Sequence, residues 1–222
     1  MSYKFVIGID EVGRGSLAGP VVVAAFAAPL KSKIKNPWPG RQRSKLRLRD
    51  SKKLSPKQRE EWFEYIKSSS EFVFATRSVS PRVIDKINIS AAANLAAHRA
   101  LRHLIKTYKL SAKNYKLFLD GGLYIKNKTH QAKFFVNAET VIRGDEKISA
   151  VALASIVAKV LRDRHMVKLH KKYPVYSFDV HKGYGTEKHR AIIQRLGITP
   201  IHRLTFCEKL SSISKLKNQR SK

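Results

Sequence analysis

The sequence predicts an α/β fold in which helices cover a central mixed β-sheet. Apolar runs rich in Val, Ile and Ala come first in the chain, and later strand-like runs alternate with helical segments, an order typical of such a sheet. With 222 residues, of which 43% are hydrophobic, the chain is long enough for one large domain with a real core. No internal repeat is evident.

Strand and helix signals alternate through the first half of the chain. The apolar runs 3–9 and 20–28 predict neighbouring strands separated by a glycine-rich turn. A helix is expected from 56 to about 68, because Ser55 offers an N-cap, a proline follows it, and a glutamine stands in the capping-box position. Residues 71–79 alternate between apolar and polar side chains and predict a further strand.

The second half continues the alternation and ends in helices. Apolar runs predict strands at 115–119, which leads directly into Asp120, and at 133–142. Cap residues and apolar periodicity predict a short helix at Pro81, helices at 89–108 and about 147–171, one from Thr186 to Gly197, and a last short one from Thr199.

The charge of this chain is far beyond what solubility requires. Lys and Arg number 45 against 16 acidic residues, for a formal net charge of +29. This excess favours a polyanionic partner, most simply nucleic acid, bound in a salt-dependent way. A basic protein associated with ribosomes or acidic membranes is the alternative on charge alone. Residues 31–49, rich in Pro, Gly and positive charge, form either a solvated insertion or an arm that contacts phosphates.

Composition also bears on where the chain works. Because Cys207 is the one cysteine, an intramolecular disulfide and a cysteine zinc site are excluded. The start of the sequence lacks a signal-peptide pattern, and the longest uncharged segment, 16–30, is too short to span a bilayer. We therefore expect a cytoplasmic protein without a membrane partner. We also expect it to be a monomer.

Four of the 16 acids stand at positions suited to metal binding. Asp10 and Glu11 end the first predicted strand, Asp120 ends a later one, and Asp145 follows a glycine just before the long helix. Strand ends converge at one edge of an open α/β sheet, and carboxylates gathered there repel one another unless a cation joins them. Oxygen ligands without clustered His or Cys favour Mg²⁺ or Mn²⁺, and two such ions suit phosphodiester cleavage. Taken singly, each acid is better explained as a turn or cap residue, so the prediction rests on the joint pattern.

Two glycine-flanked segments complete the candidate site. The turn Gly13-Arg14-Gly15 follows the acids, and its glycines let backbone N–H groups approach a polar ligand closely; the alternative for the arginine is a surface salt bridge or phosphate contact. Tyr184 lies between glycines near basic residues, where a ring stacks on nucleic acid or, alternatively, packs on the scaffold. The histidines show no ligand spacing and are interpreted as solvent or phosphate contacts: His165, His170, His181 and His189.

The long predicted helix has a face of small residues, which would pack it closely under the sheet. Ser155 lies on this face, where it either packs or supports an acid by a hydrogen bond. Asp163 stands between two arginines, and we expect it to form surface or helix-packing ion pairs rather than to act in catalysis.

Six motifs, in order, resemble the ribonuclease HII family. They are Asp10–Val22, Asp50–Ser55, Leu119–Gly121, Arg143–Asp145, Ala154–Asp163 and His181–Thr186, and the resemblance covers about residues 5–205. The chain departs from the family at Val12 and Ser16, where Ala and Pro are frequent, and at Arg143, where Lys is usual.

The resemblance implies an RNase H-like fold, a central mixed β-sheet flanked by helices with a C-terminal helical part. Residues 1–205 would be the catalytic domain, including the basic insertion at about 31–49, and residues 206–222 a basic tail. The implied activity is that of a metal-dependent endoribonuclease acting on the RNA strand of RNA–DNA hybrids. It would also cut on the 5′ side of ribonucleotides embedded in duplex DNA, leaving 3′-hydroxyl and 5′-phosphate ends.

The resemblance also assigns residues. The metal-binding catalytic acids would be Asp10, Glu11, Asp120 and Asp145, with Mg²⁺ or Mn²⁺ as cofactor. The residues contacting the ribonucleotide and its 2′-hydroxyl, which distinguishes RNA from DNA, would be Gly13, Arg14 and Gly15. Tyr184 would stack on the sugar of the following deoxynucleotide. Ser51 and Lys52 would lie near the phosphate backbone.

Two rival classes remain open. A non-catalytic basic nucleic-acid-binding protein explains the charge equally well but not the placement of the acids. Another nuclease of the RNase H fold, such as a junction resolvase or a transposase, would gather acids at one sheet edge without requiring the Gly-Arg-Gly turn.

Overall fold

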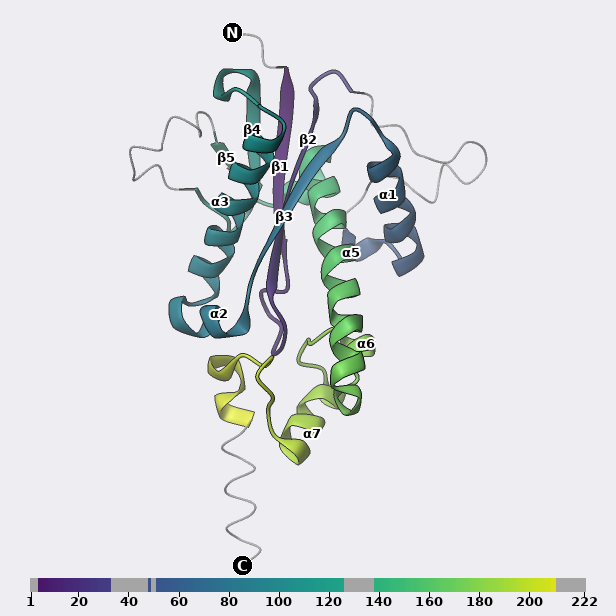
Figure 1. The fold of residues 1–222 in the computed structure, drawn as a ribbon, viewed down its shortest axis with the longest axis vertical. Coiled ribbons are helices and arrows are strands. Elements are labelled where there is room, and N and C mark those ends of the chain that lie inside the picture. Colours follow the sequence, from purple (N-terminus) through teal and green to yellow (C-terminus); the bar gives the residue numbers. More distant parts are fainter. Residues whose placement is uncertain (1–3, 33–47, 49–50, 126–137, 211–222) are drawn as a thin grey trace, which may run out of the picture.

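The computed structural model describes residues 4–32, 48, 51–125 and 138–210. Within these ranges one mixed sheet has the strand order β3-β2-β1-β4-β5 (Figure 1). The strands are β1 (Phe5–Val12), β2 (Val21–Pro29), β3 (Val73–Val79), β4 (Tyr115–Asp120) and β5 (Ala138–Val141). Pairing is antiparallel between β1 and β2 and between β2 and β3, whereas β1, β4 and β5 run parallel. The predicted mixed sheet is confirmed.

Helices cover both faces of this sheet and one of its ends (Figure 1). The α-helices are α1 (Pro56–Ser68), α2 (Pro81–Ile87), α3 (Ile89–Thr107), α4 (Gly144–Lys147), α5 (Ser149–Lys172), α6 (Phe178–His181) and α7 (Glu187–Leu196). Short 3-10 helices are η2 (Ser51–Lys53), η3 (Ala112–Asn114) and η5 (Pro174–Tyr176). A further helical segment spans 204–210.

Strand β2 is buried on both faces, which explains why its sequence is a continuous apolar run. Alternate residues of a strand point to opposite faces. Val21 and Val23 therefore join the cluster under α3, whereas Ala24 and Phe26 join the cluster under α1 and α5. The sheet is thus the middle layer between two apolar cores.

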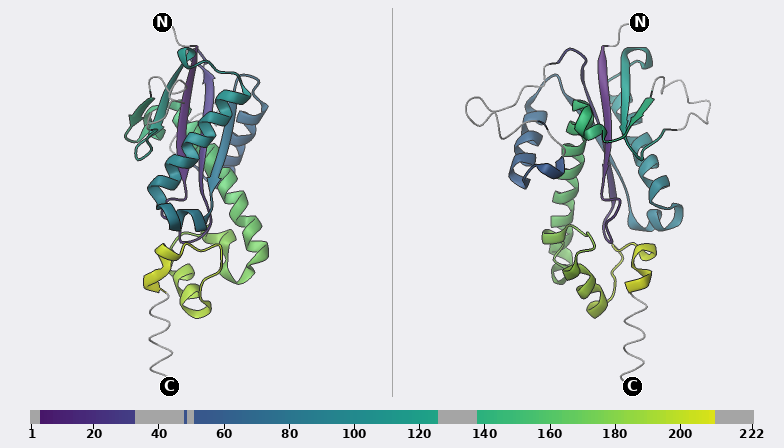
Figure 2. Two further views of the ribbon diagram at one scale, coloured as in Figure 1. Left: turned by 60° about the vertical axis from the view of Figure 1, so that its left-hand side comes forward. Right: turned by 180° about the vertical axis from the view of Figure 1, so that it is seen from behind.

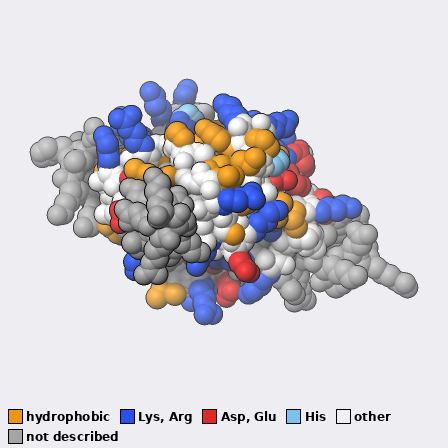
Figure 3. Space-filling model, turned by 90° about the horizontal axis from the view of Figure 1, so that it is seen from below, with side chains coloured by type: hydrophobic (Ala, Val, Ile, Leu, Met, Phe, Trp, Pro, Cys, Tyr) orange, Lys and Arg blue, Asp and Glu red, His pale blue; other side chains and the backbone are white. Residues whose placement is uncertain are grey.

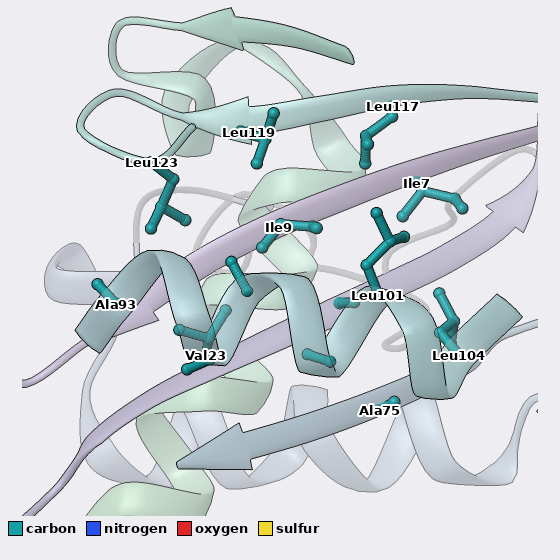
Figure 4. Packing of buried hydrophobic residues seen from close by; sticks show 14 of the residues in the cluster. Ile7, Ile9, Val23, Ala75, Ala93, Leu101, Leu104, Leu117, Leu119 and Leu123 are labelled. Carbon is teal, nitrogen blue, oxygen red and sulfur yellow. The ribbon is translucent and has the colours of Figure 1, made fainter. Parts of the chain in front are cut away.

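One core lies between the sheet and α3 (Figure 4). Its helix begins at Asn88, whose side chain accepts the N–H of Ala91 (3.0 Å). Leu101 and Leu104 of α3 face Ile7 of the sheet in this core (Figure 4). The predicted helix at 89–108 is confirmed to within a residue.

The other core lies under α1 and α5, and α5 approaches the sheet very closely. A Cβ on Gly8 of β1 would come within 2.2 Å of the backbone carbon of Ala150, so only glycine fits this position. The small-residue face predicted for this helix is therefore what brings it against β1. The capping box of Ser55 and Gln58 at the start of α1 is also confirmed.

The C-terminal helices form a separate layer at the end of the sheet, as Figure 2 shows. Their small core contains Met166 of α5, Tyr176, Phe178 and Ile192, together with Ala18 from the turn after β1. The glycine-rich turn between the first two strands is therefore clamped between the sheet and the C-terminal layer.

The long helix expected at about 147–171 is confirmed as α5, and a separate turn, α4, precedes it because Ile148 has an extended backbone between the two. One helix prediction needs correction. The prediction that a short helix starts at Thr199 is wrong. The N–H and the hydroxyl of Thr199 instead bond to Nδ1 of His202 in a turn (both 2.9 Å). The last helical segment begins instead near Leu204, whose N–H bonds to Oδ2 of Asp85 (2.9 Å).

Several sequence predictions fall on residues outside the described ranges. They concern most of the basic segment 31–49, the start of the apolar run 133–142, and the tail beyond 210. Within the described ranges, no helix combines the length and apolar character that crossing a membrane requires.

Candidate active site

Three carboxylates meet where the parallel strands β1 and β4 end. Asp10 and Glu11 lie at the end of β1, and Asp120 is the last residue of β4, one position beyond the pair Ile9 and Leu119. One ligand oxygen from each acid lies within 4.8 Å of the others. Parallel pairing thus produces the convergence of acids that the sequence predicts.

The three acids lie close enough to repel one another; Asp10 is buried, and Glu11 and Asp120 are partly buried. Burial raises the pKa of Asp10 well above its usual range, and the negative charges of Glu11 and Asp120 add to this. Burial also raises the pKa of Glu11, although the Arg14 guanidinium opposes the effect. Among the described residues, Oε2 of Glu11 is buried without a hydrogen-bond partner. A divalent cation would meet both the repulsion and the unpartnered oxygen, so the donor set fits Mg²⁺ or Mn²⁺.

Asp145 is close to this group but not part of it. It is buried in α4, directly after Gly144, whose N–H donates to Oδ1 of Asp120 (2.8 Å). The turn into α4 begins at Arg143, which has a left-handed backbone (φ 55°). The fourth predicted acid therefore neighbours the three others through the backbone, while its role as a ligand remains a prediction.

Two serine hydroxyls form a hydrogen-bonded chain that leads to Asp10. Ser155 of α5 hydrogen-bonds to Asp10, and its Oγ lies 2.8 Å from Oγ of Ser51. Ser51 is buried in η2, whereas Lys52 beside it is exposed. Of the two alternatives for Ser155, the structure shows the hydrogen bond to the acid.

The Gly-Arg-Gly turn lies directly beside the acids. Nη1 of Arg14 donates to Oε1 of Glu11 (3.3 Å) and to the carbonyl oxygen of Gly122 (3.2 Å). Gly13 has a positive φ of 91°, while a Cβ on Gly15 would meet open space. The arginine side chain thus contacts Glu11 of the acidic group, and Gly15 beside it is exposed.

Tyr184 lies against the same turn although it is far away in sequence. It forms an isolated β-bridge with Ser16. Its half-buried ring has Nζ of Lys159 at 5.4 Å and Cζ of Arg162 at 5.2 Å from the ring centroid. The acids, the turn and the tyrosine thus occupy neighbouring positions.

Comparison with known sequences assigns the family. The family model described as Ribonuclease HII matches residues 7–209. The chain belongs to the ribonuclease HII family. The ribonuclease HII of Endomicrobium trichonymphae is 44% identical over 212 residues, which cover 96% of this chain and 90% of that protein. The ribonuclease HII of Caldicellulosiruptor bescii is 40% identical over 211 residues, covering 95% and 90%.

Solved structures of ribonucleases H share the fold. The Archaeoglobus fulgidus ribonuclease HII, solved in complex with PCNA, is 26% identical with a TM-score of 0.68, covering 94% of this chain and 96% of that one. The ribonuclease H2 of Pyrococcus horikoshii OT3 is 24% identical with a TM-score of 0.69, covering 95% and 99%. The predicted RNase H-like fold is therefore confirmed.

Family membership also decides between the open classes of function. As a member of this family, the chain is a hydrolytic endoribonuclease of RNA–DNA hybrids. This fits a cluster of carboxylates that could hold a metal ion in an otherwise strongly basic chain.

Two arginines of this site were not predicted from the sequence. Arg162 and Arg203 are fully buried beside the turn, and the signal for the first was its place four residues after Ala158 on the buried stripe of α5. Interpreting His181 and His189 as solvent or phosphate contacts is wrong, because both are buried. Asp163 does form the expected ion pairs, with Lys159 (2.9 Å) and Arg59 (3.9 Å).

Proposed function

We propose that this protein cuts on the 5′ side of a ribonucleotide, in hybrids and within duplex DNA, leaving 3′-hydroxyl and 5′-phosphate ends. The observation that carries the proposal is the group formed by Asp10, Glu11 and Asp120, whose ligand oxygens lie within 4.8 Å of one another. Asp145 is the proposed fourth ligand. Bound Mg²⁺ or Mn²⁺ ions would supply activation of a water and stabilisation of the leaving 3′ oxygen.

Hydrogen bonds from neighbouring residues orient the acids that would hold the ions. Ser155 holds the Asp10 carboxylate by a hydrogen bond, and the N–H of Gly144 holds the carboxylate of Asp120 (2.8 Å). Such hydrogen bonds fix the direction in which a ligand oxygen points. Arg14 occupies Oε1 of Glu11 and leaves Oε2 for an ion.

Substrate recognition is proposed for the turn and the loop beside it. Gly13, Arg14 and Gly15 would meet the 2′-hydroxyl through backbone groups that no Cβ obstructs. Tyr184 would stack on the sugar that follows the ribonucleotide. Lys52 would approach the phosphate backbone, with Ser51 beside it.

The strong positive charge of the chain supports a nucleic-acid partner. Lys and Arg side chains recur over the end of the molecule formed by the C-terminal helices (Figure 3). Positive charge of this kind binds phosphates and makes affinity depend on salt. We propose that the protein works as a monomer in the cytoplasm, with residues 1–205 as catalytic domain and 206–222 as tail.

Replacement of Asp120 by Asn tests the metal-site assignment. The amide keeps an oxygen to accept the Gly144 N–H but carries no charge to hold an ion. We expect a loss of about 3 kcal/mol of transition-state stabilisation, or about 100-fold in kcat, on a duplex with one ribonucleotide and Mg²⁺.

The matched control is Glu139→Gln on neighbouring β5, an exposed acid that pairs with Lys116 (3.5 Å) and should be neutral. Asp145→Asn provides a separate test of the fourth ligand and should resemble Asp120→Asn. Cleavage by Asp120→Asn at the rate of the control would overturn the assignment.

A further inference from the structure

Two buried arginines lie beneath the Gly-Arg-Gly turn. Arg162 of α5 and Arg203, just before the segment 204–210, are both 0% exposed. Within the described ranges, neither forms an ion pair with a carboxylate. A buried guanidinium is costly unless its donors are satisfied, so the partners that it does have are informative.

Arg203 bonds to the first two residues of the turn. Its Nη2 donates to the carbonyl of Gly13 (2.7 Å) and its Nη1 to the carbonyl of Arg14 (2.7 Å). Its Nε and Nη2 also donate to the carbonyl of Gly19 (3.1 and 3.0 Å). One rigid fork therefore fixes three carbonyl groups around the loop from Gly13 to Gly19.

Arg162 ties the same loop to the loop that carries Tyr184. Its donors reach Oγ of Ser16 (2.8 Å) and the carbonyls of Ala18 (3.2 Å), Pro20 (3.1 Å) and Lys182 (3.0 Å). A Cβ on Gly13 would come within 2.3 Å of Nε of Arg162. The guanidinium thus lies directly against the turn. Ser16, one of the departures from the family pattern, supplies one of its acceptors.

The direction of these carbonyls fixes the opposite face of the turn. In a planar trans peptide the C=O and the following N–H point in opposite directions. Because the carbonyls of Gly13 and Arg14 point inward to Arg203, the N–H groups of Arg14 and Gly15 point away from it. Within the described part of the chain, neither N–H group has a hydrogen-bond partner.

We propose that Arg162 and Arg203 are positioning residues for ribonucleotide recognition, holding the turn so that the N–H groups of Arg14 and Gly15 face the substrate. The proposal rests on the proposed function of the turn and adds the residues that hold it in place. Two buried positive charges beneath the turn also favour the approach of a phosphate to its outer face.

Conservative variants test this role. Arg162→Lys and Arg203→Lys keep the positive charge and remove the fork that holds several carbonyls. The matched control is Arg164→Lys, two residues further along α5, where the exposed arginine pairs with Glu60. Cleavage of a duplex with one ribonucleotide is measured with Mg²⁺, and Mn²⁺ affinity is measured without substrate.

Misplacement of the turn should lower kcat by about 100-fold in both variants. Their KM and Mn²⁺ affinity should stay near those of the wild type, because phosphate contacts and the acids are unchanged. Both variants cutting with the kcat of Arg164→Lys would overturn the proposal. Failure of the wild type to cut this duplex would instead overturn the proposed function, so the two failures are distinguishable.

A second measurement uses the wild type and does not depend on the folding of variants. Amide exchange should be fast at Arg14 and Gly15 in the free protein and slow after binding a ribonucleotide-containing duplex with Ca²⁺. The amides of Leu17 and Gly19 should be protected throughout, because they donate to the carbonyls of Gly183 and Ile201 (both 2.8 Å). Protection of Arg14 and Gly15 in the free protein, or no change on binding, would contradict the proposed orientation.

Discussion

Gly13 occupies a position that no other residue fits. Its φ of 91° is unfavourable for any side chain, and a Cβ would come within 2.3 Å of Nε of Arg162. Gly15, two residues on, has neither constraint. The two glycines of one motif therefore have different physical reasons to be glycine, close packing for the first and an open face toward solvent for the second.

This difference predicts different outcomes for two alanine variants. Gly13→Ala should lower the free energy of unfolding by at least about 2 kcal/mol, from left-handed strain and the clash with the guanidinium. Gly15→Ala should unfold like the wild type and lose only ribonucleotide cleavage. Urea unfolding of both variants checks the prediction, and equal stabilities would show that Arg162 does not pack against the turn.

At the residue scale, prediction from sequence succeeded where residue types were rare. In a chain with 16 acids, those at predicted strand ends were conspicuous, and Asp10, Glu11 and Asp120 do come together. Arg162 and Arg203 were hidden because 45 basic residues form the background. Their burial depends on contacts between segments far apart in the chain, which no local pattern reports.

At the scale of elements, a chain of hydrogen-bonded neutral histidines links Thr199 to the loop of Tyr184 within the C-terminal layer. The N–H of Thr199 donates to Nδ1 of His202 (2.9 Å), so the proton of this ring lies on Nε2. That nitrogen lies 3.1 Å from Nε2 of His189, whose Nδ1 donates to the carbonyl of Tyr184 (2.9 Å). His181 stacks on His189 with ring centroids 4.1 Å apart. This chain of histidines ends on the backbone of Tyr184, the residue proposed to stack on the sugar.

Acid should destabilise this layer. Burial lowers the pKa of His189 and of His202 to about 4, and neighbouring imidazoles add to the effect. The unfolded state takes up protons first, so the stabilisation is complete above about pH 6.5 and is lost as pH falls towards about 4.

Urea unfolding across this pH range measures the loss, and His202→Asn should reduce it. His103→Asn on the exposed side of α3 is the control and should leave the pH dependence of the free energy of unfolding unchanged. A free energy of unfolding that does not fall with acid, or that falls equally in His202→Asn, would contradict the chain of neutral histidines.

Elements with strong local signals were predicted well. The capping box before α1, the Thr186 cap of α7 and Gly197 at its end all occur as expected. The break between α4 and α5 was missed because Ile148 is an ordinary helix residue by pattern. It is the packing of Gly144 against Asp120 that defines this turn, with the Gly144 N–H bonded to the carboxylate.

At the scale of the whole molecule, the sheet order brings the parts of the site together. β1 lies between β2 and β4, so the end of β1 supplies two acids, the end of β4 a third, and the connection to β2 the glycine turn. The sequence predicted the strands and the helical cover. The strand order and the clamping of the turn by the C-terminal layer came only with tertiary contacts. The basic segment 31–49 lies largely outside the described residues, so its two interpretations stay open.

The most direct test of the central claim is the position and chemistry of the cut. Wild-type protein with Mg²⁺ is given duplex DNA containing one ribonucleotide, the same duplex without it, and a four-way junction, and the product ends are mapped. We predict one cut on the 5′ side of the ribonucleotide, with 3′-hydroxyl and 5′-phosphate ends, and no cut in the other two. Equal cleavage of the all-DNA duplex would contradict an acid cluster that acts only beside a ribose. Cleavage without a divalent ion would contradict the metal-binding role of these acids.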